Sequence, residues 1–259
     1  MLKMNSYKTI IFFLSFTLVS FGCATSQNIV SAPEPGLKAE AVSEGICLTF
    51  GTIPEEAARL FVHFQYLTNE DNYNEHNLVS SFSDLRGSSL EYVKQAGKVI
   101  FPIVQEGREY FIAVNFQDEN FNDLSDWLYT DCIANKGIYL NNDLTLRLNE
   151  RHSGVTLSSE PTFSSDVIFD TEKYYFGVYI QHKMTDTDSG SIAIGSHHIP
   201  TVKGLTWVFD PEMAYILKEN EYLERGTYLA YVTARCNIIY DNIKWSVEIA
   251  KTPEFVYTL

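Results

Sequence analysis

The sequence predicts an all-β protein made of two tandem β-sandwiches that follow a signal peptide and a flexible tether. Three observations predict it. Apolar residues recur at every second position through most of the chain, which is the period of a β-strand. Phe, Tyr and Trp make up 14% of the residues. One tyrosine-containing pattern occurs once in each half.

The N-terminus has the pattern of an export signal. Lys3 and Lys8 precede an apolar run over residues 10–21. A run of about a dozen residues is too short for the roughly 20 that span a bilayer as a helix. A basic start, a short apolar segment and small residues after it indicate cleavage. We expect residues 1–22 to be a signal peptide.

Gly22 and Cys23 directly follow the apolar run, and this stretch resembles the lipobox of bacterial lipoproteins. Ser20 stands where that family usually has Leu, and Phe21 is bulkier than usual. The resemblance implies that Cys23 is acylated and becomes the first residue. The alternative is an ordinary signal peptide, cut for example after Ala24.

Residues 23–37 are small, polar and proline-containing, which predicts a flexible tether after the lipidated cysteine. The lipoprotein resemblance implies a lipid-anchored protein of the bacterial cell envelope. In many such proteins Asp after the cysteine retains the protein at the inner membrane. Ala24 is not Asp, so the outer membrane is favoured over the inner.

The charge of the chain is strongly acidic, with 19 basic and 33 acidic residues and a formal net charge of −14. Loss of Lys3 and Lys8 with the signal leaves 17 basic residues against 33 acidic ones, or −16. Such a surface repels phosphate backbones, so nucleic acid is not expected as a partner.

Three cysteines remain if Cys23 is acylated: Cys47, Cys132 and Cys236. An odd number leaves at least one thiol unpaired. No Cys-x-x-Cys or Cys/His spacing indicates zinc. The cysteines are interpreted as small core residues. A disulfide between Cys47 and Cys132 is the alternative that the sequence leaves undecided.

Alternating segments mark the strands of the first half. In "ICLTF" the residues Ile46, Leu48 and Phe50 share a face, and "LFVHFQY" continues the alternation, with His63 and Gln65 on its opposite face. Half-buried strands of this kind favour antiparallel sheets.

The stretch "VQEGREYFIAV" resembles the fibronectin type III domain, whose pattern Leu-x-Pro-Gly-x-x-Tyr precedes inward residues two and four places later. Here the matching positions are Val104, Gly107, Tyr110, Ile112 and Val114. Glu106 replaces the usual Pro, and the usual tryptophan on the second strand is missing. The resemblance implies an immunoglobulin-like sandwich over residues 38–141, with a corner in which the Tyr110 hydroxyl bonds to the chain upstream.

The second half repeats this plan over residues 142–259. "LERGTYLAYVTA" carries the same corner at Tyr228, with one residue fewer before the tyrosine, and "GVTLSS" and "KYYFGVYIQ" match the second and third strands. Asp241-Asn242 separates two alternating runs and predicts a two-residue hairpin. One continuous, elongated sandwich is the rival architecture.

No nucleophile elbow, metalloprotease helix or phosphate loop occurs, so the chain is predicted not to be an enzyme and to need no cofactor. Asp118, Asn120, Asn122 and Asp126 stand in a calcium-loop register. Position six is Asp123 instead of Gly, and position twelve is Tyr129 instead of Glu. The segment is therefore predicted to be a solvated loop without a metal.

Five aromatic residues are candidates for lying off the core faces, where they could stack on sugars or anchor a protein: Trp127, Tyr129, Tyr175, Tyr179 and Tyr231. The prediction is a non-catalytic envelope protein for binding, adhesion or assembly, with a protein or glycan ligand. The alternatives are a polysaccharide-binding accessory module or glycan-active enzyme component, and a structural spacer in an envelope complex.

Overall fold

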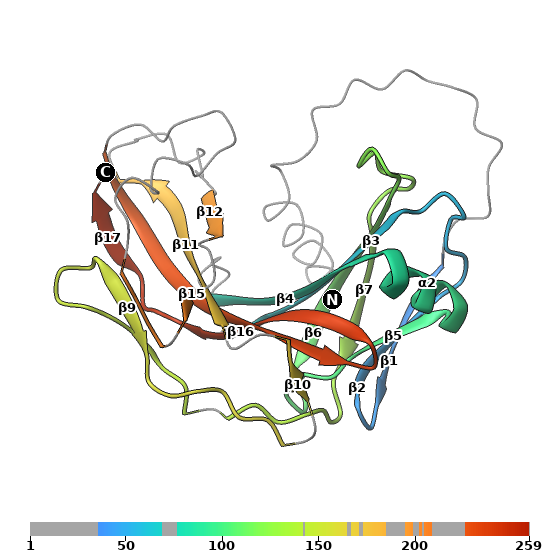
Figure 1. Ribbon diagram of the computed structural model, residues 1–259, viewed down its shortest axis with the longest axis horizontal. Helices are drawn as coiled ribbons and strands as arrows, with labels where there is room; N and C mark the ends of the chain where they lie inside the picture. Colours follow the sequence, from blue (N-terminus) through green and yellow to red (C-terminus); the bar gives the residue numbers. More distant parts are fainter. Residues whose placement is uncertain are drawn as a thin grey trace, which may run out of the picture. The chain divides into compact units, whose positions relative to one another are not determined.

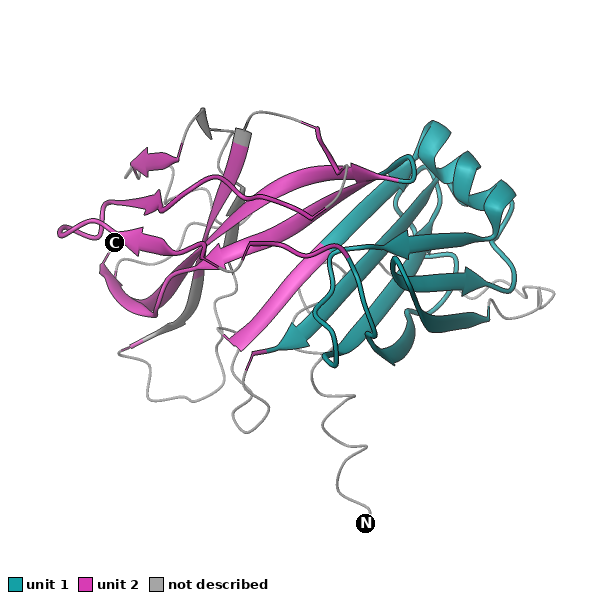
Figure 2. Cartoon of the chain, turned by 90° about the horizontal axis from the view of Figure 1, so that it is seen from below, with its two compact units in different colours: residues 1–67, 82–137, 241–243 teal, residues 68–81, 138–240, 244–259 magenta. Residues whose placement is uncertain are grey.

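A computed structural model describes residues 36–68, 77–141, 143–164, 167–170, 173–184, 195–198, 202–203, 205–208 and 226–258 (Figure 1). The predicted signal peptide, Cys23 and nearly all of the tether lie outside these ranges. The chain divides into two compact units, coloured in Figure 2. Unit 1 takes its residues from 1–67, 82–137 and 241–243, and unit 2 from 68–81, 138–240 and 244–259.

Unit 1 contains two antiparallel sheets. The first has the order β1-β2-β5, formed by Leu37–Val42, Gly45–Phe50 and Lys98–Phe101. In the second, β3 (Arg59–Leu67) pairs with β6 (Glu109–Gln117), and β6 pairs with β7 (Leu128–Ile133). The part of β4 (Leu78–Arg86) that belongs to this unit lies on the other side of β3.

The core of unit 1 is filled by alternate side chains of both sheets. Ile46 and Leu48 of β2 are fully buried, as are Leu60 and Val62 of β3. Aromatic rings join the two sheets. The Phe64 and Phe101 rings stack with centroids 4.4 Å apart, and Phe50 meets Phe116 edge-on at 6.0 Å. The predicted alternation is therefore the packing pattern of a sandwich.

Tyr110 forms the predicted corner. Gly107 turns the chain with φ of +75°, where glycine has no Cβ penalty. The backbone N–H of Gln105 then donates to the Tyr110 hydroxyl at 3.0 Å. Tyr110 is 2% exposed, and burial raises the pKa of its phenol well above the usual value. The hydroxyl thus ties the turn to the start of β6.

Unit 2 repeats this strand order. The strands β8 (Leu146–Leu148), β9 (Gly154–Leu157) and β14 (Thr206–Val208) form one sheet with β9 in the centre. The other sheet has the order β12-β11-β15-β16, from Gly195–His198, Lys173–Lys183, Thr227–Tyr240 and Ile243–Lys251. Short strands flank it: β10 (Ile168–Phe169) and β17 (Phe255–Thr258) pair with β15, and β13 (Val202–Lys203) pairs with β11.

The second core follows the predicted pattern. Tyr174, Phe176 and Val178 are buried, and the Phe176 ring stacks on Trp207 of β14 at 6.1 Å. Tyr228, at the second corner, is 2% exposed, while the residues upstream of Gly226 lie outside the described part.

The predicted hairpin is confirmed. Asp241 and Asn242 form a two-residue turn between β15 and β16, with φ of 48° and 61°. Two successive positive φ values are the signature of a type I′ turn, which suits the twist of paired strands.

Helix α2 (Gly87–Ala96) was not predicted. It buries Leu90 and Val93, three residues apart, and ends at Gly97 in the left-handed conformation with φ of +64°. No helix among the described residues is long and apolar enough to cross a bilayer. Otherwise the all-β prediction with immunoglobulin-like, fibronectin type III-like sandwiches is confirmed.

The cysteines Cys47, Cys132 and Cys236 are free thiols. Cys236 is buried in unit 2, where burial raises the pKa of its thiol to about 12. This agrees with its interpretation as a small core residue. Cys47 and Cys132 are only partly buried and form no disulfide with each other, so the core interpretation is wrong for these two.

We expect Tyr110→Phe to lower the free energy of unfolding by about 1–2 kcal/mol, because the Gln105 N–H loses its partner in a partly buried turn. Urea unfolding of the purified protein measures this. Tyr139→Phe, at a 57% exposed ring, is the control and should change stability by less than about 0.5 kcal/mol. Equal effects of the two variants would show that the corner hydrogen bond does not stabilise unit 1.

Candidate functional site

The second sheet of unit 1 has a face that points away from the sandwich core. Since Leu60, Val62 and Phe64 of β3 point inward, the side chains between them point to the other side. We call this other side the outer face. It carries alternating rings and planar polar groups from three strands: Arg59, Phe61, His63, Gln65, Phe82, Asp84, Arg86, Asn115 and Gln117.

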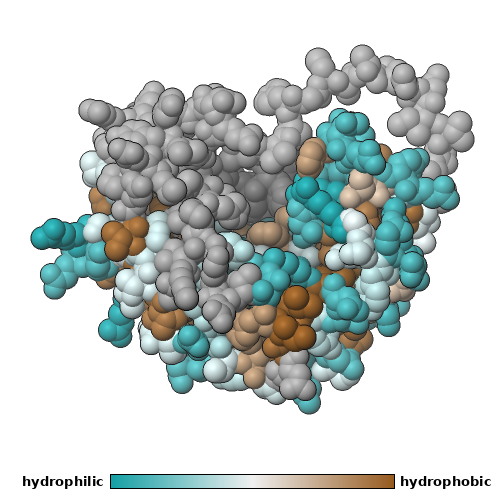
Figure 3. All heavy atoms as spheres, in the orientation of Figure 1, coloured by the Kyte–Doolittle hydropathy of each residue, from teal (hydrophilic) through white to brown (hydrophobic). Residues whose placement is uncertain are grey.

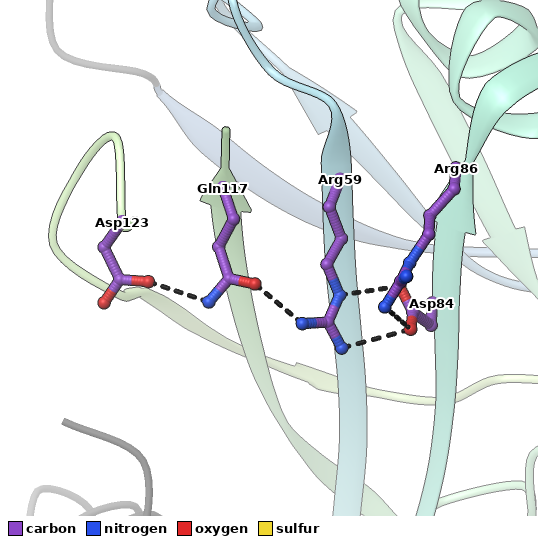
Figure 4. Close-up of polar contacts among 5 residues, drawn as sticks. All are labelled: Arg59, Asp84, Arg86, Gln117 and Asp123. Carbon is purple, nitrogen blue, oxygen red and sulfur yellow. Dashed lines mark hydrogen bonds and ion pairs between the residues drawn. The ribbon is translucent and has the colours of Figure 1, made fainter. Parts of the chain in front are cut away.

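A chain of polar contacts crosses one end of the outer face (Figure 4). Arg59 donates two hydrogen bonds to Asp84, from Nε to Oδ1 at 2.8 Å and from Nη2 to Oδ2 at 3.1 Å. Arg86 donates to the same carboxylate, from Nε to Oδ1 at 3.1 Å and from Nη2 to Oδ2 at 2.9 Å. The Nη1 group of Arg59 also donates to Gln117 Oε1 at 2.7 Å, and Gln117 Nε2 donates to Asp123 Oδ1 at 2.9 Å.

The pKa of Asp84 is set by opposing effects. Burial by itself would raise it, but the hydrogen bonds from Arg59 and Arg86 and their positive charges outweigh burial, so the net pKa is lowered. Asp84 therefore stays ionised at neutral pH and holds both guanidinium groups in place.

The predicted calcium-register loop is closed by its own hydrogen bonds. The carboxylate of Asp118 accepts from the backbone N–H of Asn120 at 2.8 Å and from that of Asn122 at 2.9 Å. It also accepts from Asn122 Nδ2 at 2.9 Å. The Asn122 hydrogen bonds, with those from the backbone, lower the pKa of Asp118. Among the described residues, no group of three metal-ligating side chains comes together.

This loop presents Phe121 to solvent in a strained conformation. Its ring is 58% exposed, and its φ is +65°, in a region that only glycine adopts freely. The guanidinium carbons of Arg59 and Arg86 lie 5.6 and 5.3 Å from the ring centroid. Strain of this kind persists only where the surroundings enforce it, and it often marks a functional position.

An aromatic cluster continues the outer face beyond Arg59. Phe61 contacts Phe82 at 5.5 Å and Trp127 edge-on at 6.1 Å between ring centroids. His63 lies 6.0 Å from Phe61 and 6.4 Å from Phe82. The rings come from β3, from β4 and from the residue before β7, so the pairing of these strands assembles the cluster.

Asn115 lies in the middle of this cluster. It is opposite Phe61 in the β3–β6 register, and the β6–β7 register places it next to Trp127 on the other side. Its side chain is fully buried. Among the described residues neither Oδ1 nor Nδ2 has a hydrogen-bond partner. A buried amide in that state costs about 1–3 kcal/mol for each unsatisfied group.

The five aromatic residues predicted from the sequence do not form one site. Trp127 joins the cluster of unit 1, and Tyr129 is 48% exposed on β7. In unit 2, the rings of Tyr179 and Tyr231 stack at 5.2 Å, and Lys251 Nζ lies 4.8 Å from the Tyr231 centroid. Tyr175 accepts a hydrogen bond from Asn237 Nδ2 at 2.8 Å.

Sequence reasoning missed Arg59, Asp84, Arg86 and Phe121. The available signal was the polar alternation of β3, which had already placed His63 and Gln65 on the face opposite the core. It did not reveal the partners, because Asp84 lies 25 residues away from Arg59 and Gln117 lies 58 residues away.

No family model and no curated protein matches the chain. Among solved structures it is similar to a segment of two fibronectin type III domains from chicken tenascin. The identity is 11%, the match covers 87% of this chain and 98% of that one, and the TM-score is 0.27.

A second similar structure is a chain from the crystal structure of the mouse coronavirus receptor-binding domain complexed with its murine receptor. Here the identity is 11%, the coverage is 86% and 98%, and the TM-score is 0.22. Scores this low carry no conclusion about fold or function. The description of the fold rests on its strand order and on the Tyr110 corner.

We expect Asp84→Asn to lower the free energy of unfolding at pH 7 by about 1 kcal/mol, since the two arginines lose a half-buried carboxylate. A lowered pKa in the folded state stabilises the fold above the unfolded-state pKa, near 3.8. That stabilisation is lost as the pH falls through the folded-state pKa. Urea unfolding from pH 7 to pH 2.5 should show the two proteins converging in acid. A gap that stays constant with pH would contradict this account.

Replacement of Phe121 tests the strain. Phe121→Ala removes the ring and keeps a Cβ at positive φ, whereas Phe121→Gly removes both. We expect the glycine variant to be about 1 kcal/mol more stable than the alanine variant. Thermal and urea unfolding of both variants measure the difference. Equal stabilities would show that the loop does not hold residue 121 in the left-handed region in solution.

Proposed function

We propose that this chain is a lipid-anchored, non-catalytic binding protein of the bacterial cell envelope, with the outer face of unit 1 as its contact surface. The observation that carries the proposal is Phe121, a large ring held exposed and strained beneath two guanidinium groups. Exposed aromatic and arginine side chains dominate the energetics of recognition surfaces.

The electrostatics of the site support binding over proton transfer. A general acid or base works best with a pKa close to the operating pH. The pKa of Asp84 is moved away from neutrality, and its two oxygens are occupied by Arg59 and Arg86. The network is suited to holding side chains in fixed positions, which lowers the entropy cost of recognition.

The exposed surface of the described residues is mixed in polarity. In the view of Figure 3, hydrophobic residues of the described surface gather in small patches between hydrophilic ones. Small scattered patches are ordinary on a protein surface, so the proposal rests on Phe121 and the arginine network and not on surface hydrophobicity. Partners with phosphate backbones are disfavoured by the net charge of −14.

The anchor and the location are inferred from the N-terminal residues. The apolar run before Cys23 supports export, and the position of Cys23 supports acylation. Several acyl chains would hold the protein firmly, at about 0.8 kcal/mol for each buried methylene. Ala24 favours the outer membrane. A structural spacer within an envelope complex is the alternative role, and it would need no exposed ligand surface.

Metabolic labelling with a clickable fatty-acid analogue tests the anchor. We expect the wild-type protein to be labelled and to enter the detergent phase, because acylation supplies its only predicted attachment to the membrane. Cys23→Ser should be unlabelled, while Cys47→Ser should label like the wild type. Wild-type protein without label, beginning at a residue other than Cys23, would contradict the anchor.

A further inference from the structure

We infer that the outer face of unit 1 binds a neutral carbohydrate, stacked on its rings and hydrogen-bonded by Asn115 and the arginine network. This inference rests on the proposed binding function and specifies the ligand class. Its first ground is the mixture of groups on the face: Phe61, Phe82, Trp127 and Phe121 offer ring faces, and planar polar groups lie between them. A sugar has apolar C–H faces and hydroxyl groups, and it uses both kinds of partner.

The second ground is the buried carboxamide of Asn115. It lies opposite Phe61 in the strand register and is fully buried, with a donor and an acceptor unused among the described residues. An amide can accept from one hydroxyl and donate to another. Buried polar groups of native proteins are nearly always satisfied, and exceptions call for an explanation such as a bound partner. Two sugar hydroxyls, or one hydroxyl that donates to Oδ1 and a ring oxygen that accepts from Nδ2, would supply both missing bonds.

The third ground is charge balance. Two positive groups, Arg59 and Arg86, face two negative ones, Asp84 and Asp123, within one connected network. No net charge is left over to attract an anionic or a cationic ligand. The charges are fixed by one another and still present polar edges, so a neutral ligand with many hydroxyl groups fits this surface.

The geometry of the site disfavours an extended peptide as its occupant. A peptide that adds a strand pairs with the backbone at the edge of a sheet. The outer face is instead a sheet face, on which the backbone groups of β3 and β6 are already paired. It offers side chains alone, with rings set at angles to one another and amides between them, and these groups can contact both the C–H faces and the hydroxyl groups of a sugar.

Affinity electrophoresis tests the inference, with the full protein purified in detergent and run in native gels that contain α-mannan, xylan or amylopectin. We expect at least one of these neutral polysaccharides to retard the wild type. Phe121→Gly and Asn115→Leu should each weaken the apparent affinity at least tenfold. Tyr139→Ala, which removes an exposed ring outside the site, should leave it within twofold.

Asn115→Leu separates binding from folding. Leucine has the same branched shape and number of heavy atoms as asparagine, although it is bulkier, and it removes the unsatisfied amide, so the melting temperature should stay the same or rise. Loss of retardation in a variant of equal or higher melting temperature supports a ligand role for the amide. Unchanged retardation in both Asn115→Leu and Phe121→Gly overturns the inference.

Two further outcomes separate this inference from the proposed function. A parallel gel contains polygalacturonate, an anionic polysaccharide. If only polygalacturonate retards the protein, or no polysaccharide does, the neutral-carbohydrate assignment is overturned. A pull-down from detergent extracts then decides the rest. A protein retained by the wild type and lost with Phe121→Gly would leave the binding function standing with a protein ligand. If the pull-down retains no protein and Cys23 carries no lipid, the proposed function is overturned as well.

Discussion

The register between β3 and β6 is the constraint on which the outer face depends. Val62 lies opposite Val114, and Phe61 lies opposite Asn115, so one set of pairs fills the sandwich and the next set faces the other way. A shift of β3 by one residue would turn its outward side chains inward and bury Arg59 and His63 between the sheets. The cost of burying those groups in an apolar core makes the observed register the stable one. The packing of the core thereby determines where the side chains of the candidate site lie, independently of the contacts that these side chains make with one another.

The sequence revealed the parts of this arrangement that depend on local pattern. The alternation of apolar residues predicted the strands. The Tyr110 motif predicted a hydrogen bond between residues a few positions apart, and Asp241-Asn242 predicted a two-residue hairpin turn. The contacts of the outer face depend on strands far apart in the chain. Asp84 reaches Arg59 across 25 residues, and Phe61 reaches Trp127 only through the pairing of β3, β6 and β7. Which residues oppose each other is set by the whole sheet, so no single stretch could predict the site.

The loop around Asp118 illustrates how one pattern supports two structures. Alternating carboxylates and amides can surround a calcium ion, or the carboxylate can accept hydrogen bonds from its own loop. The backbone N–H groups of Asn120 and Asn122 point at Asp118, which satisfies the carboxylate and bends the chain. The bend forces Phe121 into positive φ and projects its ring outward. The carboxylate of Asp118 thus fixes the position of an aromatic side chain.

The repeated strand order shows that the fold by itself does not create such a surface. In unit 2 the equivalent strands, β11 and β15, also carry rings: Tyr179 stacks on Tyr231, and Lys251 of β16 lies over the Tyr231 ring. Yet Tyr231 is only 5% exposed, compared with 58% for Phe121. A buried stack stabilises its own unit, whereas an exposed ring can gain contacts from a partner. Tyr231 belongs to a strand and Phe121 to the loop that follows β6, so the exposed ring of unit 1 comes from its loop and not from the strands that the two units share.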